Sequence, residues 1–230
     1  MMLDLPGLFW LLLTVAGYGV SRLLYARLRW YVVSPIIFVT VLLYAATLWQ
    51  QVSYAEYAHY SHWLITLLGP ATVAFAVPIW QQRRLLARYW QALLAGLCVG
   101  SGVAIGSSWL LARLLMLDDR VLLSMLPRSI STPFAMPMSA TVGGVPELTA
   151  AFVMITGLGG AILGSLLIKL LPLKSALARG ALFGMGAHGV GTSKAYEVGL
   201  EEGTVAGLVM VLAGLSNLLG AQLVLWLLRG

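Results

Sequence analysis

The chain has 230 residues, of which 60% are hydrophobic and only 10% are charged, and its formal net charge is +6. A soluble domain carries about 25% charged residues, so this composition leaves too few charges to cover a water-facing surface. With a mean hydropathy of +0.91, the chain is expected to be an integral membrane protein rather than a soluble globular one.

The apolar runs, taken in chain order, are each close to the roughly 20 residues that span a bilayer as a helix. Residues 5–20 form a short first run that is expected to be retained, because no small-residue cleavage site follows it. Residues 32–49 form the second run, and the loop at residues 50–61 is expected outside the cell because it contains no Lys or Arg. Residues 62–80 and 90–117 form the third and fourth runs. The runs do not alternate polar and apolar residues, so helices are expected rather than a barrel.

The centre of the chain, residues 127–146, reads PRSISTPFAMPMSATVGGVP and interrupts this pattern with four prolines and a Gly-Gly pair. No continuous helix is expected there, and a broken or re-entrant segment fits best. Irregular backbone at membrane depth must be buried in protein or line a wet cavity. The alternative is a loop outside the membrane. A clean span is predicted at residues 148–171, a second broken segment at 180–199 and a last span at 205–228.

The fold class expected from these runs is an all-α polytopic membrane protein with about six to eight transmembrane helices, some of them broken or re-entrant. One transmembrane domain, residues 1–230, is expected. Its parts would be an N-terminal helix pair at 1–60, broken-helix units at 61–120 and 121–175, and a C-terminal signature segment with the last helix at 176–230. Placing Phe75-Ala76-Val77-Pro78 on Phe134-Ala135-Met136-Pro137 aligns the two middle parts. If the central segment enters and leaves the membrane on one side, the expected orientation makes them an inverted repeat; if it crosses fully, the third basic cluster falls outside, against the positive-inside rule. Broken helices in paired repeats indicate the substrate site in transporters.

The positive charges form three clusters that each follow an apolar run, as in the cytoplasmic loops of a multi-pass inner-membrane protein. The clusters are Arg22, Arg27 and Arg29; Arg83, Arg84 and Arg88; and Lys169, Lys174 and Arg179. A nucleic-acid-binding face would not be divided by membrane spans, so no nucleic-acid partner is expected. No HExxH, GxSxG or Walker motif is present, and the single cysteine is Cys98. Neither an enzyme nor a metal or other cofactor is therefore expected.

The first broken segment offers groups that can replace the hydration shell of a small anion. Its hydroxyl donors are Ser129, Ser131, Thr132 and Ser139. Pro133 and the turn at Gly143 and Gly144 are expected to create helix ends, and a helix N-terminus attracts an anion through free N–H groups and about half a positive charge. Alternatively, the hydroxyls bond only backbone carbonyls and the prolines only kink helices.

The second broken segment supplies further candidates for substrate binding, namely His188, Gly189, Gly191, Thr192 and Lys194. His188 titrates near neutral pH, so it is a candidate for binding the carboxylate or carrying a coupling proton. Glu147 is a second candidate for coupling, although capping the start of a helix is its simpler role. His188 and Lys194 also have simpler interpretations, as a packed core residue and as a charge at the interface.

Three strings carry a resemblance to a known family. Residues 126–151, residues 187–203 (AHGVGTSKAYEVGLEEG) and residues 68–74 (LGPATVA) resemble the signatures of the LrgB/CidB family. The resemblance covers nearly the whole chain. It implies a small membrane partner of the LrgA/CidA type. It also implies one of two functions, a transporter of small monocarboxylates such as pyruvate, glycolate or glycerate, or a holin-like regulator of murein hydrolase export and cell lysis.

The candidate residues and the resemblance together favour a carrier of a small anionic metabolite. The carrier is expected to work in the lipid bilayer by alternating access and to form a homo-oligomer. A simple pore does not require prolines and hydroxyls in the middle of the membrane. The alternatives are the lytic regulator and a structural subunit whose small partner performs the function.

Overall fold

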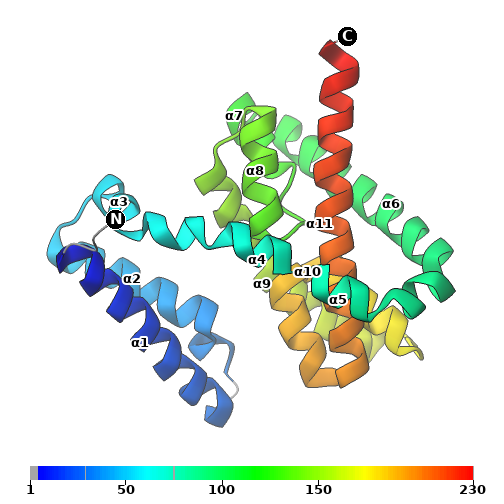
Figure 1. Ribbon diagram of the computed structural model, residues 1–230, viewed down its shortest axis with the longest axis horizontal. Coiled ribbons are helices and arrows are strands. Elements are labelled where there is room, and N and C mark those ends of the chain that lie inside the picture. Colours follow the sequence, from blue (N-terminus) through cyan, green and yellow to red (C-terminus); the bar gives the residue numbers. More distant parts are fainter. Residues whose placement is uncertain (1–4, 29, 75, 230) are drawn as a thin grey trace. The chain divides into compact units, whose positions relative to one another are not determined.

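The computed structural model describes residues 5–28, 30–74 and 76–229, and the regular elements among these residues are all helices (Figure 1). The expected all-α polytopic class is therefore confirmed. The chain divides into two compact units, Met1–Gly69 and Pro70–Gly230. Arg29 of the first basic cluster and Phe75 of the proposed repeat lie outside the described residues.

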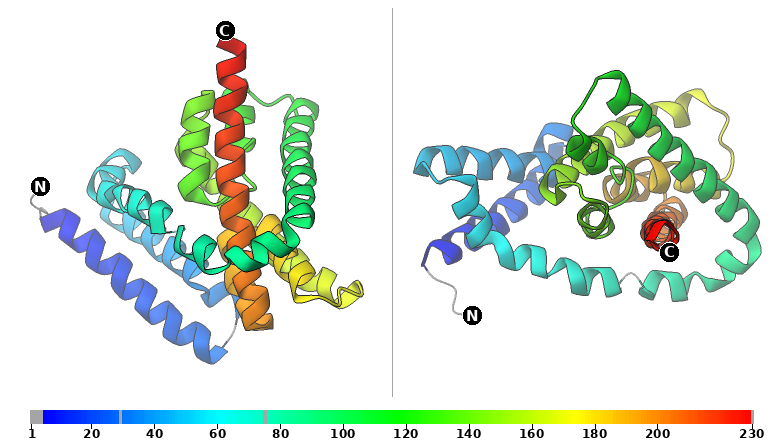
Figure 2. Two further views of the ribbon diagram at one scale, coloured as in Figure 1. Left: turned by 45° about the vertical axis from the view of Figure 1, so that its right-hand side comes forward. Right: turned by 90° about the horizontal axis from the view of Figure 1, so that it is seen from above.

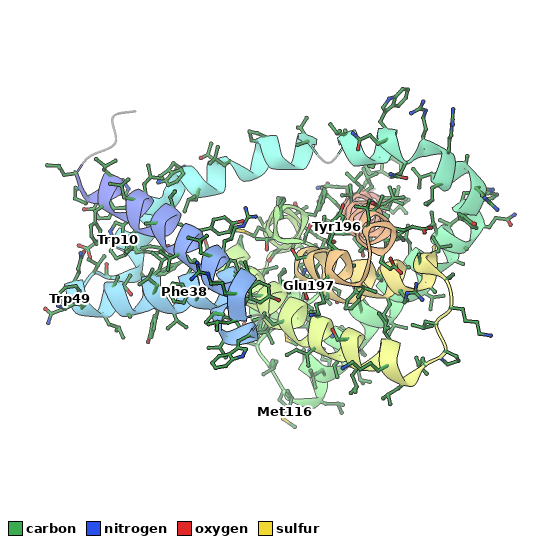
Figure 3. The ribbon with its side chains drawn as sticks, turned by 90° about the horizontal axis from the view of Figure 1, so that it is seen from below. Trp10, Phe38, Trp49, Met116, Tyr196 and Glu197 are labelled. Atoms are coloured by element: carbon green, nitrogen blue, oxygen red, sulfur yellow. The ribbon has the colours of Figure 1, made fainter. Side chains whose placement is uncertain are left out.

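The first unit consists of α1 (Leu5–Leu28), η1 (Tyr31–Val33), α2 (Pro35–Gln50) and α3 (Tyr54–Thr66). Trp10 of α1 is buried and meets the ring of Tyr57 edge-on, with ring centroids 5.2 Å apart (Figure 3). The predicted loop at residues 50–61 is wrong for most of its length, because α3 begins at Tyr54. The Glu56 carboxylate accepts the Ser53 N–H at 2.8 Å, and Ser53 Oγ accepts the Glu56 N–H, which is the capping box that starts a helix.

The second unit begins with broken helices and continues with a long one. The third apolar run folds as α4 (Leu68–Ala74) and α5 (Ala76–Gln81) after the end of α3, so it is not one continuous helix. Helix α6 (Arg83–Leu114) carries the fourth run, with a kink at Tyr89.

The central segment forms a helical hairpin, here called the first hairpin, whose arms are α7 (Asp119–Met125) and α8 (Thr132–Val142). The tip of this hairpin, the first tip, is residues 126–131. The arms meet again at the base, because a Cβ at Gly144 would touch the backbone of Leu123 and Ser124. The segment is more helical than expected, since Pro133 occupies the first turn of α8 and Pro137 lies within it. Proline is compatible with the first turn, where its missing N–H would have no partner.

Helix α9 (Pro146–Leu170) follows, and α10 (Ala176–Val198) then forms a second hairpin with its tip at His188, the second tip. His188 has φ 37° and ψ −119°, which breaks the helix into two arms. Both arms run beside the same part of α11 (Leu200–Arg229), in opposite directions. A Cβ at Gly180 of the first arm would meet Val205, while Tyr196 of the second arm lies against Gly203.

Four described helices have the length and composition of a membrane span, namely α1, α6, α9 and α11 up to Leu227. The expected six to eight spans exceed this number because the other apolar runs fold as shorter elements, such as α2 and the hairpin arms. Helices α6, α9 and α11 expose large apolar side chains, including Val99, Ile162 and Leu223. Such apolar surface suits contact with lipid.

The hairpin followed by a long helix occurs twice in the second unit, at residues 119–170 and again at 176–229. The repeat proposed from the sequence, between residues 61–120 and 121–175, stays a prediction.

Candidate functional site

The two hairpins approach each other from opposite ends of α9. The base of the first hairpin, at Gly143 and Gly144, leads directly into the start of α9, and the end of α9 leads into the base of the second hairpin. At 25 residues, α9 is about 37 Å long, close to the thickness of a membrane. A Cβ at Gly157, near the middle of α9, would lie 2.8 Å from Cε1 of His188. The second tip therefore lies at mid-depth.

The first tip reaches the same level. A backbone hydrogen bond joins the His188 ring to Arg128. Ile130 and Phe134, on either side of Ser131, belong to an apolar cluster with Val153 of α9 and Met210 of α11. Met210 in turn lies 4.0 Å from where a Cβ on Gly189 would be. The two tips are therefore neighbours, and α8 and α11 run side by side above them (Figures 1 and 2).

Ser131 of the first tip is the N-cap residue of α8, yet its side chain does not cap the helix. An N-cap serine ordinarily accepts a hydrogen bond from one of the first N–H groups of its helix. Ser131 is 7% exposed, and its Oγ has no hydrogen-bond partner within the described part of the chain. The start of α8 thus combines an uncapped N-terminus with a hydroxyl that is not committed elsewhere.

His188 of the second tip is 3% exposed, and its Nε2 also lacks a partner among the described residues. Its backbone lies in the positive-φ region that is costly for a residue with a side chain. In the second unit, Ser131 Oγ and His188 Nε2 are the described buried side-chain atoms without a partner. Buried polar groups are nearly always hydrogen-bonded, so two exceptions at the two tips mark this region as a candidate binding site.

The space beside the tips is small in this structure. A cavity of about 10 Å³ is bordered by Ser129 and Pro127 of the first tip, Met185 of α10 and Asn217 of α11. That volume suits a single water molecule. The amide nitrogen of Asn217 donates to Ser101 Oγ at 2.7 Å and holds α11 against α6. A carboxylate would require the tips to separate.

A larger cavity of about 340 Å³ lies between α6, the first arm of α10 and α11, and apolar side chains such as Leu93, Leu177 and Val209 line it. Because its lining is mostly apolar, this cavity offers few polar groups to bind a charged ligand.

The structure divides the residues predicted for substrate binding. Ser129, Ser131, Thr132 and Pro133 lie at the first tip or in the first turn of α8, close to His188 and Gly189. Ser139, Gly143 and Gly144 lie at the other end of α8. The Ser139 hydroxyl is fully buried, 2.7 Å from Thr149 Oγ1, which also lies 3.0 Å from the Ser124 carbonyl oxygen. These contacts tie the base of the first hairpin to α9.

Three other candidates lie on the second arm of α10, away from its tip. Gly191 packs against the first arm, because a Cβ there would overlap the carbonyl oxygen of Phe183. The Thr192 hydroxyl donates to the carbonyl oxygen of His188 at 2.9 Å and supports the break. Lys194 donates to the carboxylate of Glu197 at 2.6 Å.

Glu197 and Tyr196 lie near the start of α11, at the base of the second hairpin (Figure 3). The coupling candidate Glu147 is exposed in the first turn of α9, at the base of the first hairpin.

Sequence reasoning did not identify the hydrogen-bond partners that hold Arg128 and the first tip. Arg128 donates from Nε to Ser108 Oγ at 2.7 Å, from one terminal nitrogen to Thr156 Oγ1 at 3.3 Å and from the other to Ser107 Oγ at 3.3 Å. The Ser107-Ser108 pair and Asn217 interrupt apolar runs, and polar residues inside spans commonly bond neighbouring helices. That signal points to these positions but not to their partners.

The fold and the meeting of its tips define a class, a polytopic helical membrane protein with two opposed helical hairpins. Within that class the chain belongs to the LrgB-like family, whose model matches residues 14–227. The expected family is thus confirmed.

Three relatives from Bacillus subtilis (strain 168) are similar along almost their whole length. The chain is 38% identical to the uncharacterized protein YxaC over 217 residues, which cover 94% of each chain. It is 36% identical to the uncharacterized protein YwbG over 219 residues, or 95% of this chain and 97% of YwbG. It is 30% identical to the antiholin-like protein LrgB over 212 residues, or 92% of each chain. No solved structure shows a significant match.

Proposed function

We propose that this protein carries small monocarboxylates of the pyruvate, glycolate or glycerate type across the cell inner membrane, together with a small partner of the LrgA/CidA type. The observation that carries the proposal is the meeting of two hairpin tips, each with a buried polar atom that has no partner in the described part of the chain, Ser131 Oγ and His188 Nε2. The hydroxyl is a hydrogen-bond donor, and the protonated imidazole donates from Nε2 while its other ring nitrogen bonds the Arg128 backbone carbonyl, so both suit a carboxylate.

The backbone adds a second favourable feature. Helix α8 begins at the first tip and the second arm of α10 begins at the second tip, so both present helix N-termini to the same region. Helix N-termini bind anions through free N–H groups and the helix dipole. In transporters, half-helices that start at mid-membrane direct their N-termini at anionic substrates.

Alternating access would follow from movement of one tip at a time. The cavity of about 10 Å³ holds no carboxylate while the tips touch. Separation of either tip from the other would open the site to one side of the membrane, because the hairpins enter from opposite ends of α9.

Uptake of radiolabelled glycolate and pyruvate into proteoliposomes, with and without the small partner, tests the proposal. Wild-type protein should give saturable uptake. Thr132→Val and Ser131→Ala remove hydroxyls near the tips and should reduce uptake at least about tenfold while the protein inserts normally. Thr141→Val is the matched control, since the Thr141 hydroxyl is exposed on the same helix and bonds the Pro137 carbonyl. Wild-type uptake in Thr132→Val and Ser131→Ala would contradict the site.

His188 is proposed both to bind the carboxylate and to carry a coupling proton, and Glu147 remains an alternative carrier of that proton. His188→Ala should abolish uptake or remove its dependence on pH between about 5 and 8, the range in which histidine titrates. Uptake that keeps the wild-type rate and pH profile would make His188 a packing residue. Measuring the uptake rate and pH profile of Glu147→Gln in the same way decides whether His188 or Glu147 carries the proton.

The second candidate function is a holin-like regulator of murein hydrolase release, which is favoured by the name of one relative, antiholin-like protein LrgB. A homo-oligomer of this chain would then form or control an unselective pathway. Leakage of a trapped dye from the same proteoliposomes separates the two functions. A carrier retains the dye during uptake, whereas a pore releases it without stereochemical selectivity.

A further inference from the structure

Arg128 places a permanent positive charge at the first tip. Its guanidinium bridges the first tip to α6 through Ser107 and Ser108 and to α9 through Thr156. The side chain is half-buried, at the depth where α9 passes both tips. Arginine stays protonated in proteins, so the charge persists at every physiological pH.

The partners of Arg128 are all neutral. The ion pairs among the described residues are Arg113–Asp119, Arg179–Glu202 and Lys194–Glu197, and Arg128 belongs to none of them. A charge within a membrane-spanning bundle is costly and ordinarily pairs with an opposite charge or marks a substrate pathway. Three hydroxyl bonds orient the guanidinium but leave its charge uncompensated.

The remaining donors are placed to meet an anion. The three bonds use three of the five guanidinium N–H groups and leave one on each terminal nitrogen. Thr156, which accepts one of the bonds, is the neighbour in sequence of Gly157, which packs against the His188 ring. The cation and the His188 ring, whose Nε2 has no partner among the described residues, therefore lie at one level of α9.

Lys194 is the basic residue on the second arm of α10, and its ion pair with Glu197 neutralises it. Arg128 thus contributes a single uncompensated positive charge near the tips. A monoanion would balance this charge, whereas a dianion would leave excess negative charge in a medium of low dielectric constant.

We infer that Arg128 recognises the charge of the substrate, that it pairs with one carboxylate at the meeting point of the tips, and that it makes the site selective for monoanions over both neutral analogues and dicarboxylates. This inference rests on the proposed function for the location of the site. It adds to that function a specificity-determining residue and a selectivity for substrates with one negative charge.

Binding of glycolate and of its uncharged isostere glycolamide to purified full-length protein tests this inference, with malonate as the dianion. Wild-type protein should bind glycolate at least about tenfold more tightly than either of the others. Arg128→Gln should lose that preference, with glycolate affinity reduced at least about tenfold and glycolamide affinity changed by less than about threefold. Arg128→Lys should keep the preference for the anion at reduced affinity, because lysine lacks the planar fork.

Arg113→Gln is the matched control, since it removes an exposed arginine from the end of α6 and should leave all three affinities unchanged. Arg128→Gln that still prefers glycolate over glycolamide would overturn the inference. If this variant does not fold, Thr156→Val decides, because it removes one orienting bond and keeps the charge. Weaker glycolate binding with unchanged glycolamide binding supports the inference, and unchanged glycolate binding overturns it.

Transport separates this inference from the proposed function. Wild-type protein that binds glycolate through Arg128 but carries none into proteoliposomes contradicts the carrier and leaves the anion site standing. Uptake of glycolate that Arg128→Gln leaves intact contradicts the inference and leaves the carrier standing.

Discussion

Gly157 is the position where a single added methyl group should disturb the meeting of the tips. A Cβ there would lie 2.8 Å from His188 Cε1 and 3.0 Å from Val190 Cγ2, whereas ordinary contacts begin near 3.4 Å. Gly157→Ala therefore requires a shift of about 0.6 Å at the ring. Binding constellations tolerate about 0.5 Å of displacement, so glycolate uptake should fall by about tenfold or more. Overpacking of this kind costs about 1–3 kcal/mol of unfolding free energy.

Gly159→Ala on the same helix is the control, because nothing lies within 4 Å of the Cβ it would add. It should be neutral or stabilise the protein by up to about 1 kcal/mol, since alanine favours helix over glycine. Uptake in proteoliposomes and thermal unfolding in detergent, measured for both variants, give the comparison. If Gly157→Ala transported as well as Gly159→Ala, the contact between α9 and the second tip would have no part in the site.

Two further predictions concern the bases of the hairpins. Thr149→Val keeps the shape of the side chain but removes the hydroxyl 2.7 Å from Ser139. It should lower the free energy of unfolding by about 1–3 kcal/mol, measured by thermal unfolding, and leave the KM for glycolate unchanged. A raised KM would indicate that Ser139 belongs to the substrate site. Arg179→Gln removes the guanidinium that donates to Glu202 at 2.9 and 2.5 Å. It should lower the free energy of unfolding by about 1.5–3 kcal/mol, which is more than the loss expected for Arg113→Gln. The side chains of the Arg179–Glu202 pair are 27% and 8% exposed, whereas those of the Arg113–Asp119 pair are 56% and 77% exposed. Equal melting temperatures for the two variants would contradict a larger contribution of the Arg179–Glu202 pair to stability.

The positions of the two breaks were largely predictable, and their geometry was not. Prolines and glycines disfavour continuous helix, so residues 127–146 and 180–199 stand out in the sequence. A glycine-rich pattern favours a break at a glycine, yet the positive φ falls on His188. The neighbouring glycines serve close packing instead, with Gly184 against the backbone of Ala206 and Gly191 against Phe183.

Long-range partners lay outside the reach of pattern analysis. Ser101 and Asn217 are separated by 116 residues and Arg128 and Thr156 by 28, yet each pair forms a hydrogen bond. A polar residue in an apolar run indicates that a partner exists but not which helix supplies it, because the register between helices is set by packing. For the same reason the serines of the first broken segment looked equivalent in sequence, although Ser131 lies at the tip and Ser139 at the base.

Helix α9 links the two tips, and this constrains how the site can open. Thr156 accepts a hydrogen bond from Arg128 of the first tip, while the next residue, Gly157, and then Gly160 pack against the second tip and its first arm. The first contact is a single hydrogen bond, whereas the second is close packing, which interiors transmit rather than absorb. The first tip should therefore separate from α9 more readily than the second. Opening toward the side of the first hairpin should then break the bond between Arg128 and Thr156, and opening toward the other side should require α10 to slide along α9.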